Sequence, residues 1–171
     1  MYSLFMATRA LKVVQGWIPI HLSAVIPKDE LYLFGGPSGA GKSTVVNLLI
    51  NDGGVILDEG QVIIQKQKAD EYSANAWGYS LRTCEGPIWA VFKLIKDDCY
   101  AIEPLLPIQA ATFLLRQAEQ VVGWLLHEDI SQKLYRLTSE LAREVPAFQL
   151  RFTQEGGLWP LIDDVLNAES I

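Results

Sequence analysis

The sequence predicts an α/β domain built on a mixed β-sheet, and three observations indicate that fold class. Apart from one short helix, strand-like apolar runs dominate residues 18–102, whereas helical periodicity dominates residues 107–167. Neighbouring strands are joined by turns too short for a parallel crossover, which predicts antiparallel hairpins. The first hairpin leads into a glycine-rich loop and a helix. We expect one domain over residues 1–171, with its helices concentrated in the C-terminal half.

The composition is that of an ordinary globular protein. Half of the 171 residues are hydrophobic, 20% are charged, and the formal net charge is −6 with a pI near 4.9. This acidic balance argues against binding to nucleic acid or to an anionic membrane. No stretch approaches the ~20 apolar residues of a membrane span, and we expect no secretory leader. Cys84 and Cys99 lack metal-site spacing, which indicates reduced thiols and a cytoplasmic protein.

The first hairpin is predicted to consist of a strand over residues 18–26 and a strand over residues 31–34. In the first strand, alternate apolar residues share one face: Ile18, Ile20, Leu22, Ala24 and Ile26. His21 and Ser23 lie on its other face. Residues 27–29 form the turn, so the strand that enters the glycine-rich loop is the second arm of an antiparallel pair.

The remaining elements follow from periodicity and from turn residues. After the loop we expect a helix over residues 44–51, ended by Gly53 and Gly54, and then a strand over residues 55–57. Residues 61–65 are a candidate continuation of that strand, and the polar residues 66–80 are predicted to be a loop. The second half is predicted to contain a hairpin of residues 88–95 and 99–102, helices over 107–127, 130–144 and 158–167, and a strand over 148–152.

The glycine-rich loop carries the pattern G-x-x-x-x-G-K-[ST]. Its glycines allow backbone N–H groups to curl around phosphate oxygens, and the helix that follows presents its N-terminus to the same anion. Lys42 is expected to reach the β and γ phosphates, and Ser43 is expected to be a ligand of Mg²⁺. The predicted nucleotide-binding residues are Gly36, Pro37, Ser38, Gly39, Ala40, Gly41, Lys42, Ser43 and Thr44.

Two adjacent acids, Asp58 and Glu59, end the apolar strand that follows the loop helix, and Asp58 lies sixteen residues after Lys42. An acid at such a strand end brings a carboxylate to the metal or to the attacking nucleophile. Adjacent strand residues point to opposite faces, so both acids face the phosphates only if Gly60 distorts the strand end. We expect at least one of the two to be catalytic or metal-linked, against the alternative of a solvated strand terminus.

The order of these features resembles the catalytic domain of the HPr kinase/phosphorylase family. A histidine in a strand, a hairpin, the G-x-S-G-x-G-K-S loop, a short helix and two acids follow one another between His21 and about Ile64. The resemblance implies that Lys42 and Ser43 contact ATP and Mg²⁺, with Asp58 as a second metal residue. It also implies that Glu59 accepts the proton of the substrate hydroxyl. His21, which the strand pattern alone would leave as a structural residue, matches the active-site histidine of that family.

The sequence departs from that family at two informative places. The second acid is Glu59 where the family has aspartate. The E-x-R-G-x-G-I signature is absent, and residues 85–88, which begin with Glu85, match it only weakly. Without that signature, the resemblance does not extend to phosphorylase activity or to HPr as the substrate, and whether phosphorylase activity exists stays open. The predicted partners are a nucleotide and a protein or peptide with a serine hydroxyl, docking near residues 66–86, where Lys66, Lys68 and Arg82 supply positive charge. The oligomeric state stays open.

Three classes of function fit the motifs. The first is a small kinase that uses ATP and Mg²⁺ to phosphorylate a hydroxyl. The second is a nucleotide-binding regulatory module with weak catalysis, which the glutamate at position 59 and the missing signature favour. The third is a motor or switch NTPase, but no N-K-x-D guanine motif and no L-S-G-G-Q motif occurs in the chain.

Overall fold

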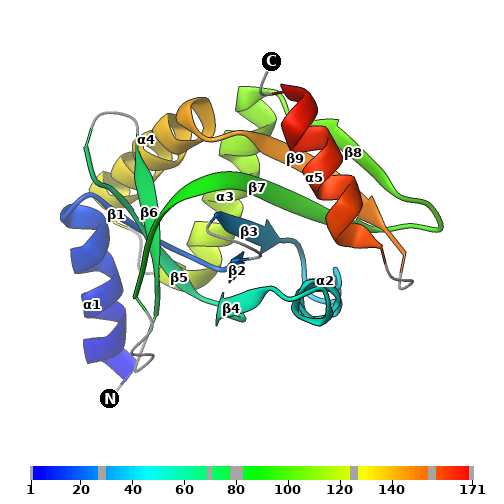
Figure 1. Ribbon diagram of the computed structural model, residues 1–171. Helices are drawn as coiled ribbons and strands as arrows, with labels where there is room; N and C mark the ends of the chain where they lie inside the picture. Colours follow the sequence, from blue (N-terminus) through cyan, green and yellow to red (C-terminus); the bar gives the residue numbers. More distant parts are fainter. Residues whose placement is uncertain are drawn as a thin grey trace.

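The computed structural model describes residues 2–26, 30–68, 71–77, 83–123, 127–153 and 157–169. Its strands form one nine-stranded sheet flanked by helices (Figure 1). The strands are β1 Trp17–Ile20, β2 Ser23–Ile26, β3 Leu31–Gly35, β4 Val55–Asp58, β5 Val62–Lys66, β6 Tyr72–Ala76, β7 Thr83–Lys96, β8 Ala101–Pro104 and β9 Ala147–Phe152. The helices are α1 Tyr2–Val14, α2 Lys42–Asn51, α3 Pro107–Val122, α4 Glu128–Glu144 and α5 Leu158–Glu169.

Strand β7 joins the two halves of the sheet. Its beginning pairs antiparallel with β6, beyond which β5 and β1 follow, again antiparallel. Its end pairs in parallel with β3 on one side and with β9 on the other. Strands β2 and β4 extend the sheet beyond β3, and β8 extends it beyond β9. The α/β class with a mixed sheet is therefore confirmed, as is the antiparallel pairing of β2 with β3, which leads into the glycine-rich loop. The predicted turn at residues 27–29 lies outside the described residues.

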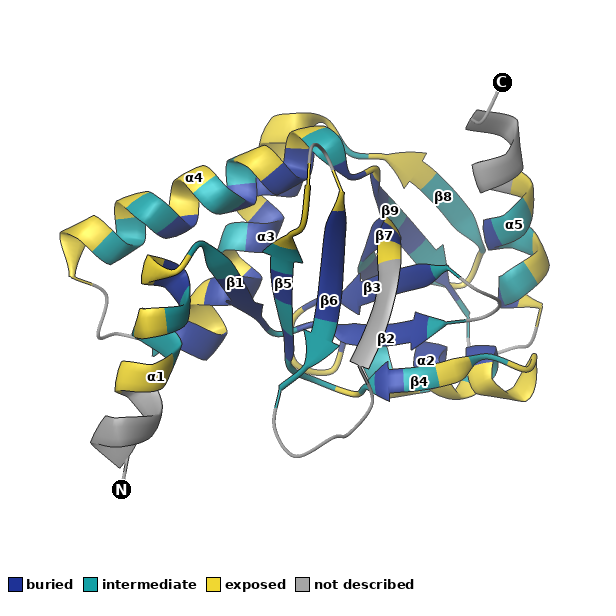
Figure 2. Ribbon diagram, turned by 60° about the vertical axis from the view of Figure 1, so that its left-hand side comes forward, coloured by how far each residue is buried: buried dark blue, intermediate teal, exposed yellow. Residues whose placement is uncertain are grey.

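The central strands are buried on both faces, as their side-chain pattern shows. Along β3, Leu31 and Leu33 pack into one hydrophobic cluster, whereas Tyr32 and Phe34 pack into another on the opposite face. Residues of α3 and α4 complete the first cluster, and residues of α2 and α5 complete the second. Figure 2 shows β2 and β3 coloured as buried, while α4 turns an exposed surface outward. Strand β3, which positions the loop, is thus held between two apolar layers.

Three phenylalanines stack across the α2 side of the sheet. Phe34, Phe92 and Phe148 are register partners on β3, β7 and β9. The ring centroid of Phe92 lies 5.2 Å from that of Phe34 and 5.6 Å from that of Phe148, and both pairs are stacked. Aromatic pairs at these separations contribute attraction beyond the area that they bury.

Helix α1 is an element that the sequence analysis missed. It packs on the β1 side of the molecule, where Arg9 Nη1 donates to the carbonyl oxygen of Val121 at 2.6 Å. Lys133 Nζ donates to the carbonyl oxygen of Val14, also at 2.6 Å, and so ties α4 to the end of α1. Within the described residues, no helix combines the length and the apolarity needed to cross a bilayer.

Two strand predictions were wrong, namely the single strand over residues 18–26 and the hairpin of residues 88–95 with 99–102. Residues 18–26 form two strands with different partners, since β1 pairs with β5 while β2 pairs with β3 and β4. The second hairpin does not form, because β9 inserts between β7 and β8 and pairs with both. Each predicted strand region exists, but its hydrogen-bonded partner lies elsewhere in the chain.

The region after the acid pair also differs from the prediction. Strand β5 is a separate strand paired with β1 and β6, not a continuation of β4. Part of the expected polar loop at 66–80 is strand β6, whose residues Tyr72, Ser73 and Ala74 are buried. The predicted helices after residue 105 are confirmed as α3, α4 and α5, within five residues at each boundary.

We expect Phe92→Ala to lower the free energy of unfolding by about 3–5 kcal/mol, because it empties the centre of the aromatic stack. Tyr135→Ala is a suitable control, since Tyr135 is 53% exposed on α4 and its loss should change stability by about 0.5 kcal/mol or less. Denaturant unfolding followed by circular dichroism measures both. A loss below about 1 kcal/mol for Phe92→Ala would contradict the packing described.

Candidate functional site

The carboxyl ends of several strands meet at one edge of the sheet. Strand β2 runs antiparallel to both β3 and β4, so β3 and β4 are parallel and end at the same edge. With β2 between them, their ends lie about 10 Å apart, because neighbouring strands are spaced by about 4.8 Å. Strands β7 and β9 are parallel to β3 and end at this edge as well. The glycine-rich loop and the acid pair therefore share an edge (Figure 1).

The loop curls tightly between β3 and α2. The Ala40 N–H donates to the carbonyl oxygen of Pro37 at 3.0 Å, and Gly39 and Gly41 have φ values of 80° and 94°. These left-handed conformations suit glycine, which has no Cβ to clash. Helix α2 begins immediately afterwards at Lys42, so its first N–H groups open on the loop. Such a concave set of backbone donors suits an anion.

Close packing holds the loop from behind. A Cβ placed on Gly41 would lie 2.5 Å from Cζ of Phe152 and 3.1 Å from Cε of Lys96. A Cβ on Gly36 would lie 2.6 Å from Cβ of Ala40. Both contacts are too short for a side chain, so the last residues of β7 and β9 brace a loop that only glycine permits at position 41.

Lys42 folds back over the loop. Its Nζ donates to the carbonyl oxygen of Gly36 at 3.1 Å, and burial lowers the pKa of the ammonium below its ordinary value. The Ser43 hydroxyl is exposed in the first turn of α2, and Thr44 beside it is half-buried. The loop residues predicted from the sequence thus form the turn between β3 and the first turn of α2.

The acid pair forms a turn in which the two carboxylates differ. Asp58 Oδ1 accepts from the N–H groups of Gly60 at 2.8 Å and of Gln61 at 2.9 Å, so it stabilises the end of β4. The Glu59 side chain is exposed, while its carbonyl oxygen accepts a 2.7 Å hydrogen bond from the buried hydroxyl of Ser23. The backbone of Glu59 is therefore fixed, and its carboxylate makes no hydrogen bond within the described part of the chain.

His21 lies between β1 and β2, against this turn. Its Nδ1 donates to Oε1 of Gln120 at 2.8 Å, and its backbone N–H donates to the carbonyl oxygen of Gln117 at 3.1 Å. Its Nε2 lies 3.8 Å from the position that a Cβ on Gly60 would occupy. The structure thus brings His21 to the acid turn and ties both to α3. Nothing in the sequence pattern indicated Gln117 or Gln120, because their partners lie about a hundred residues away.

A hollow of about 640 Å³ opens beside the loop, between β7 and α3, and we call it the α3 pocket. Its lining includes the loop residue Pro37, two cations and the glutamine that holds His21. The full lining is Pro37, Lys93, Ile108, Gln109, Thr112, Phe113, Arg116, Gln117 and Gln120. The sequence analysis missed this surface, which requires α3 to dock beside the glycine-rich loop.

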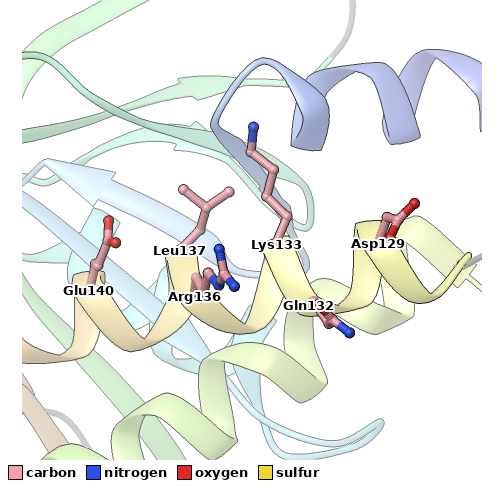
Figure 3. A pocket seen from close by; sticks show the side chains of 6 residues that line it. All are labelled: Asp129, Gln132, Lys133, Arg136, Leu137 and Glu140. Atoms are coloured by element: carbon pink, nitrogen blue, oxygen red, sulfur yellow. The ribbon is translucent and has the colours of Figure 1, made fainter.

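A second hollow of about 420 Å³ follows the surface of α4. Figure 3 shows that its side chains, among them Lys133, Arg136 and Glu140, come from one helix and point in different directions. They do not converge on a common point, and Lys133 is already bound to the backbone of Val14. This hollow has none of the features of a catalytic site.

The predicted docking region at residues 66–86 differs from expectation. Lys66 is paired with Glu144, with a 2.8 Å separation between Nζ and Oε2, and does not form part of a loose basic loop. Lys68 is exposed, whereas Arg82 and the side chain of Glu85 lie outside the described residues. Among the described residues, Lys93 and Arg116 supply positive charge in the α3 pocket beside the glycine-rich loop, and Lys96 lies against the loop at Gly41.

A metal ion at this site would need oxygen ligands from phosphate or water in addition to those of the protein. Among the described residues, no three His, Cys, Asp or Glu side chains converge into a metal-binding cluster. The donors predicted from the sequence are the Ser43 hydroxyl and Asp58, whose Oδ1 already accepts two backbone N–H groups. One or two such ligands, completed by phosphate oxygens and water, are the set that Mg²⁺ ordinarily uses.

The chain matches one family model, and it is similar to several solved structures. No curated protein matches the chain. The solved structure of the Hpr(Ser) kinase/phosphatase from Coxiella burnetii is similar over 89% of this chain and 95% of that one, with 12% sequence identity and a TM-score of 0.44. The family model described as SynChlorMet cassette protein ScmC matches residues 1–167. This family is not the HPr kinase/phosphorylase family itself. Because that match spans nearly the whole sequence, the chain belongs to the ScmC family.

Proposed function

We propose that this chain is an ATP-dependent kinase that transfers the γ-phosphoryl group of ATP to a hydroxyl of a protein or peptide substrate. The observation that carries the proposal is the shared sheet edge, where the phosphate-binding pattern and the acid pair lie about two strand spacings apart. The resemblance of residues 21–64 to HPr kinase/phosphorylase supports a serine hydroxyl as the acceptor. We expect the site to be complete within one domain of residues 1–171.

Nucleotide binding would rest on the glycine-rich loop. Its amides and the N-terminus of α2 would hold the phosphates, from Gly36 through Thr44. Lys42 would exchange its bond to the Gly36 carbonyl for the β and γ phosphates. Its lowered pKa reflects partial burial, and a half-buried ammonium gains more from an anionic partner than a solvated one does.

The donor set fits Mg²⁺ as the companion of ATP. Ser43 and Asp58 would hold the ion, since Asp58 uses only Oδ1 to stabilise its turn. When bound, the ion neutralises charge on the phosphates. The chain itself supplies Lys42 and the loop amides for the same purpose.

Glu59 is the proposed general base. Its carboxylate is exposed while its backbone is anchored through Ser23, which suits a group that must meet a substrate hydroxyl. The hydroxyl gives its proton to Glu59, and its oxygen bonds to the γ-phosphorus as the bond to the β,γ-bridging oxygen breaks, leaving ADP. His21, held by Gln120, turns its Nε2 toward the same turn, and we include it in the site.

A second candidate function is a nucleotide-binding regulatory module with weak catalysis. One specific observation favours it: Asp58 Oδ1 already accepts two backbone hydrogen bonds, as a purely structural turn residue would. The glutamate at position 59 also stands where the resembling family has aspartate. Nucleotide binding without transfer to any hydroxyl would select this candidate.

We expect Lys42→Ala to weaken ATP binding about 10- to 100-fold, since it removes a charge-assisted contact to the phosphates. Titration with a fluorescent ATP analogue in the presence of Mg²⁺ measures this change. Lys68→Ala is the matched control, because Lys68 is exposed and far along the chain from the loop. Equal affinity for wild type and Lys42→Ala would overturn the phosphate role of the loop.

We expect Glu59→Gln to lower kcat for phosphoryl transfer by about 10²- to 10⁴-fold, because the amide cannot accept the proton. The substrate is a pool of serine peptides, and the label is the γ-phosphate of radioactive ATP. Glu71→Gln, at another exposed position, controls for the change in charge. Transfer by Glu59→Gln at the wild-type rate would exclude Glu59 as the base.

Two substitutions at Asp58 separate its turn role from its metal role. Asp58→Asn keeps an acceptor for the Gly60 and Gln61 N–H groups, whereas Asp58→Ala removes it and should lower the unfolding free energy by about 1–3 kcal/mol. Both should raise the Mg²⁺ concentration needed for ATP binding, since both remove the charge. If Asp58→Asn leaves the Mg²⁺ requirement unchanged, Asp58 is structural only.

A further inference from the structure

The α3 pocket opens at the end of the glycine-rich loop where the terminal phosphate would lie. In loops of this pattern, the lysine reaches the β and γ phosphates. Here Lys42 Nζ donates to the carbonyl oxygen of Gly36. The next residue, Pro37, forms part of the pocket wall. A molecule in this pocket would therefore face the phosphoryl group that is transferred.

The same pocket is connected to the acid turn. Gln120 lines it and holds the ring of His21, whose Nε2 faces Gly60. The neighbouring Gln117 also lines it and accepts the backbone N–H of His21. The pocket is thus bounded by the glycine-rich loop on one side and tied to the turn of Glu59 on the other, as an acceptor site requires.

The charge of the pocket is positive although the chain carries a net charge of −6. Its lining holds Lys93 and Arg116 and no carboxylate among the described residues. Neither cation forms an ion pair with another described residue, and Arg116 is exposed. A guanidinium binds the planar, two-oxygen edge of a carboxylate through two parallel hydrogen bonds, so a carboxylate fits this pocket.

The pocket also contains a buried acceptor without a donor. Gln117 is only 4% exposed, and within the described part of the chain no group donates to its Oε1. Leaving such an atom unpaired costs about 1–3 kcal/mol. The oxygen itself is buried, so a ligand N–H in the pocket pairs with it once the Gln117 side chain turns toward the pocket. A peptide backbone supplies such N–H groups, and the exposed side chain of Ile108 adds an apolar contact at the rim.

We propose that the α3 pocket binds the phosphate acceptor and that this acceptor is an acidic peptide segment. Arg116 and Lys93 bind its carboxylates, and the Gln117 side chain turns so that its Oε1 accepts one of its N–H groups. The serine hydroxyl of the segment then lies between the terminal phosphate and the turn of Glu59. This inference rests on the proposed kinase function and names the substrate class for the same site.

The test measures peptide binding and nucleotide binding separately. Two fluorescein-labelled peptide pools each carry one central serine, flanked by three glutamates in one pool and by three glutamines in the other. Fluorescence polarisation is recorded with and without a non-hydrolysable ATP analogue and Mg²⁺. We expect the glutamate pool to bind at least about 10-fold more tightly than the glutamine pool, and less so at high salt.

Substitutions in the pocket assign that preference to specific side chains. Arg116→Gln should weaken binding of the glutamate pool by about 5- to 10-fold, and Arg116→Lys should restore part of it. Gln117→Met, which keeps the length of the side chain, should weaken both pools. Arg136→Gln on α4 is the matched control, an exposed arginine lining the other hollow, and should leave peptide binding at the wild-type level.

Each outcome decides one of the two proposals. Equal binding of the two pools, or glutamate-pool binding that survives Arg116→Gln, overturns the acidic acceptor while leaving the kinase proposal in place. If Arg116→Gln loses binding of the ATP analogue but keeps binding of the peptide, the acidic acceptor is also overturned, because the pocket would then hold the nucleotide. If wild type binds the glutamate pool but never the analogue, the pocket stands and the kinase proposal fails.

Discussion

The double pairing of β2 is the constraint on which the rest of the structure depends. Ser23 pairs with Phe34 on β3, and Ala24 pairs with Asp58 on β4, so one short strand fixes two others in parallel. Its residues are buried on both faces, which ties the register to the two hydrophobic clusters. Ser23 adds a hydrogen bond to the carbonyl of Glu59. The edge that holds the candidate site follows from these contacts.

Side chains and helices packed on both faces of the sheet support the edge that holds the candidate site. On one face, the phenylalanine stack and Phe152 support the glycine-rich loop, and Gly41 lies against the ring of Phe152. On the other face, α3 docks through Gln117 and Gln120, which hold His21. The proposed acceptor pocket is the space left where α3 meets the loop. Both the rigid loop and the open pocket are therefore consequences of how helices cover a mixed sheet.

The site could be predicted from the sequence where its residues lie close together in the chain. The glycine-rich loop, Lys42 and the acid pair fall within twenty-four residues, and local strand and helix patterns order them correctly. His21 was named only through resemblance, and the structure brings it beside Gly60. Arg116 and Gln117 were missed, because polar residues on a helix face look solvated unless the docking of that helix is known. Lys93 was missed because it lies on β7, and only the docking of α3 beside that strand makes it part of a pocket.

The sequence by itself determined the α/β class, the loop with its helix, and the hairpin that enters it, because each depends on spacing between neighbours in the chain. Tertiary structure alone decided that β9 lies between β7 and β8, that residues 18–26 divide between two partners, and that α1 forms. Those choices depend on which buried backbone groups find partners and which apolar faces meet. Such long-range competition leaves no local signal to read.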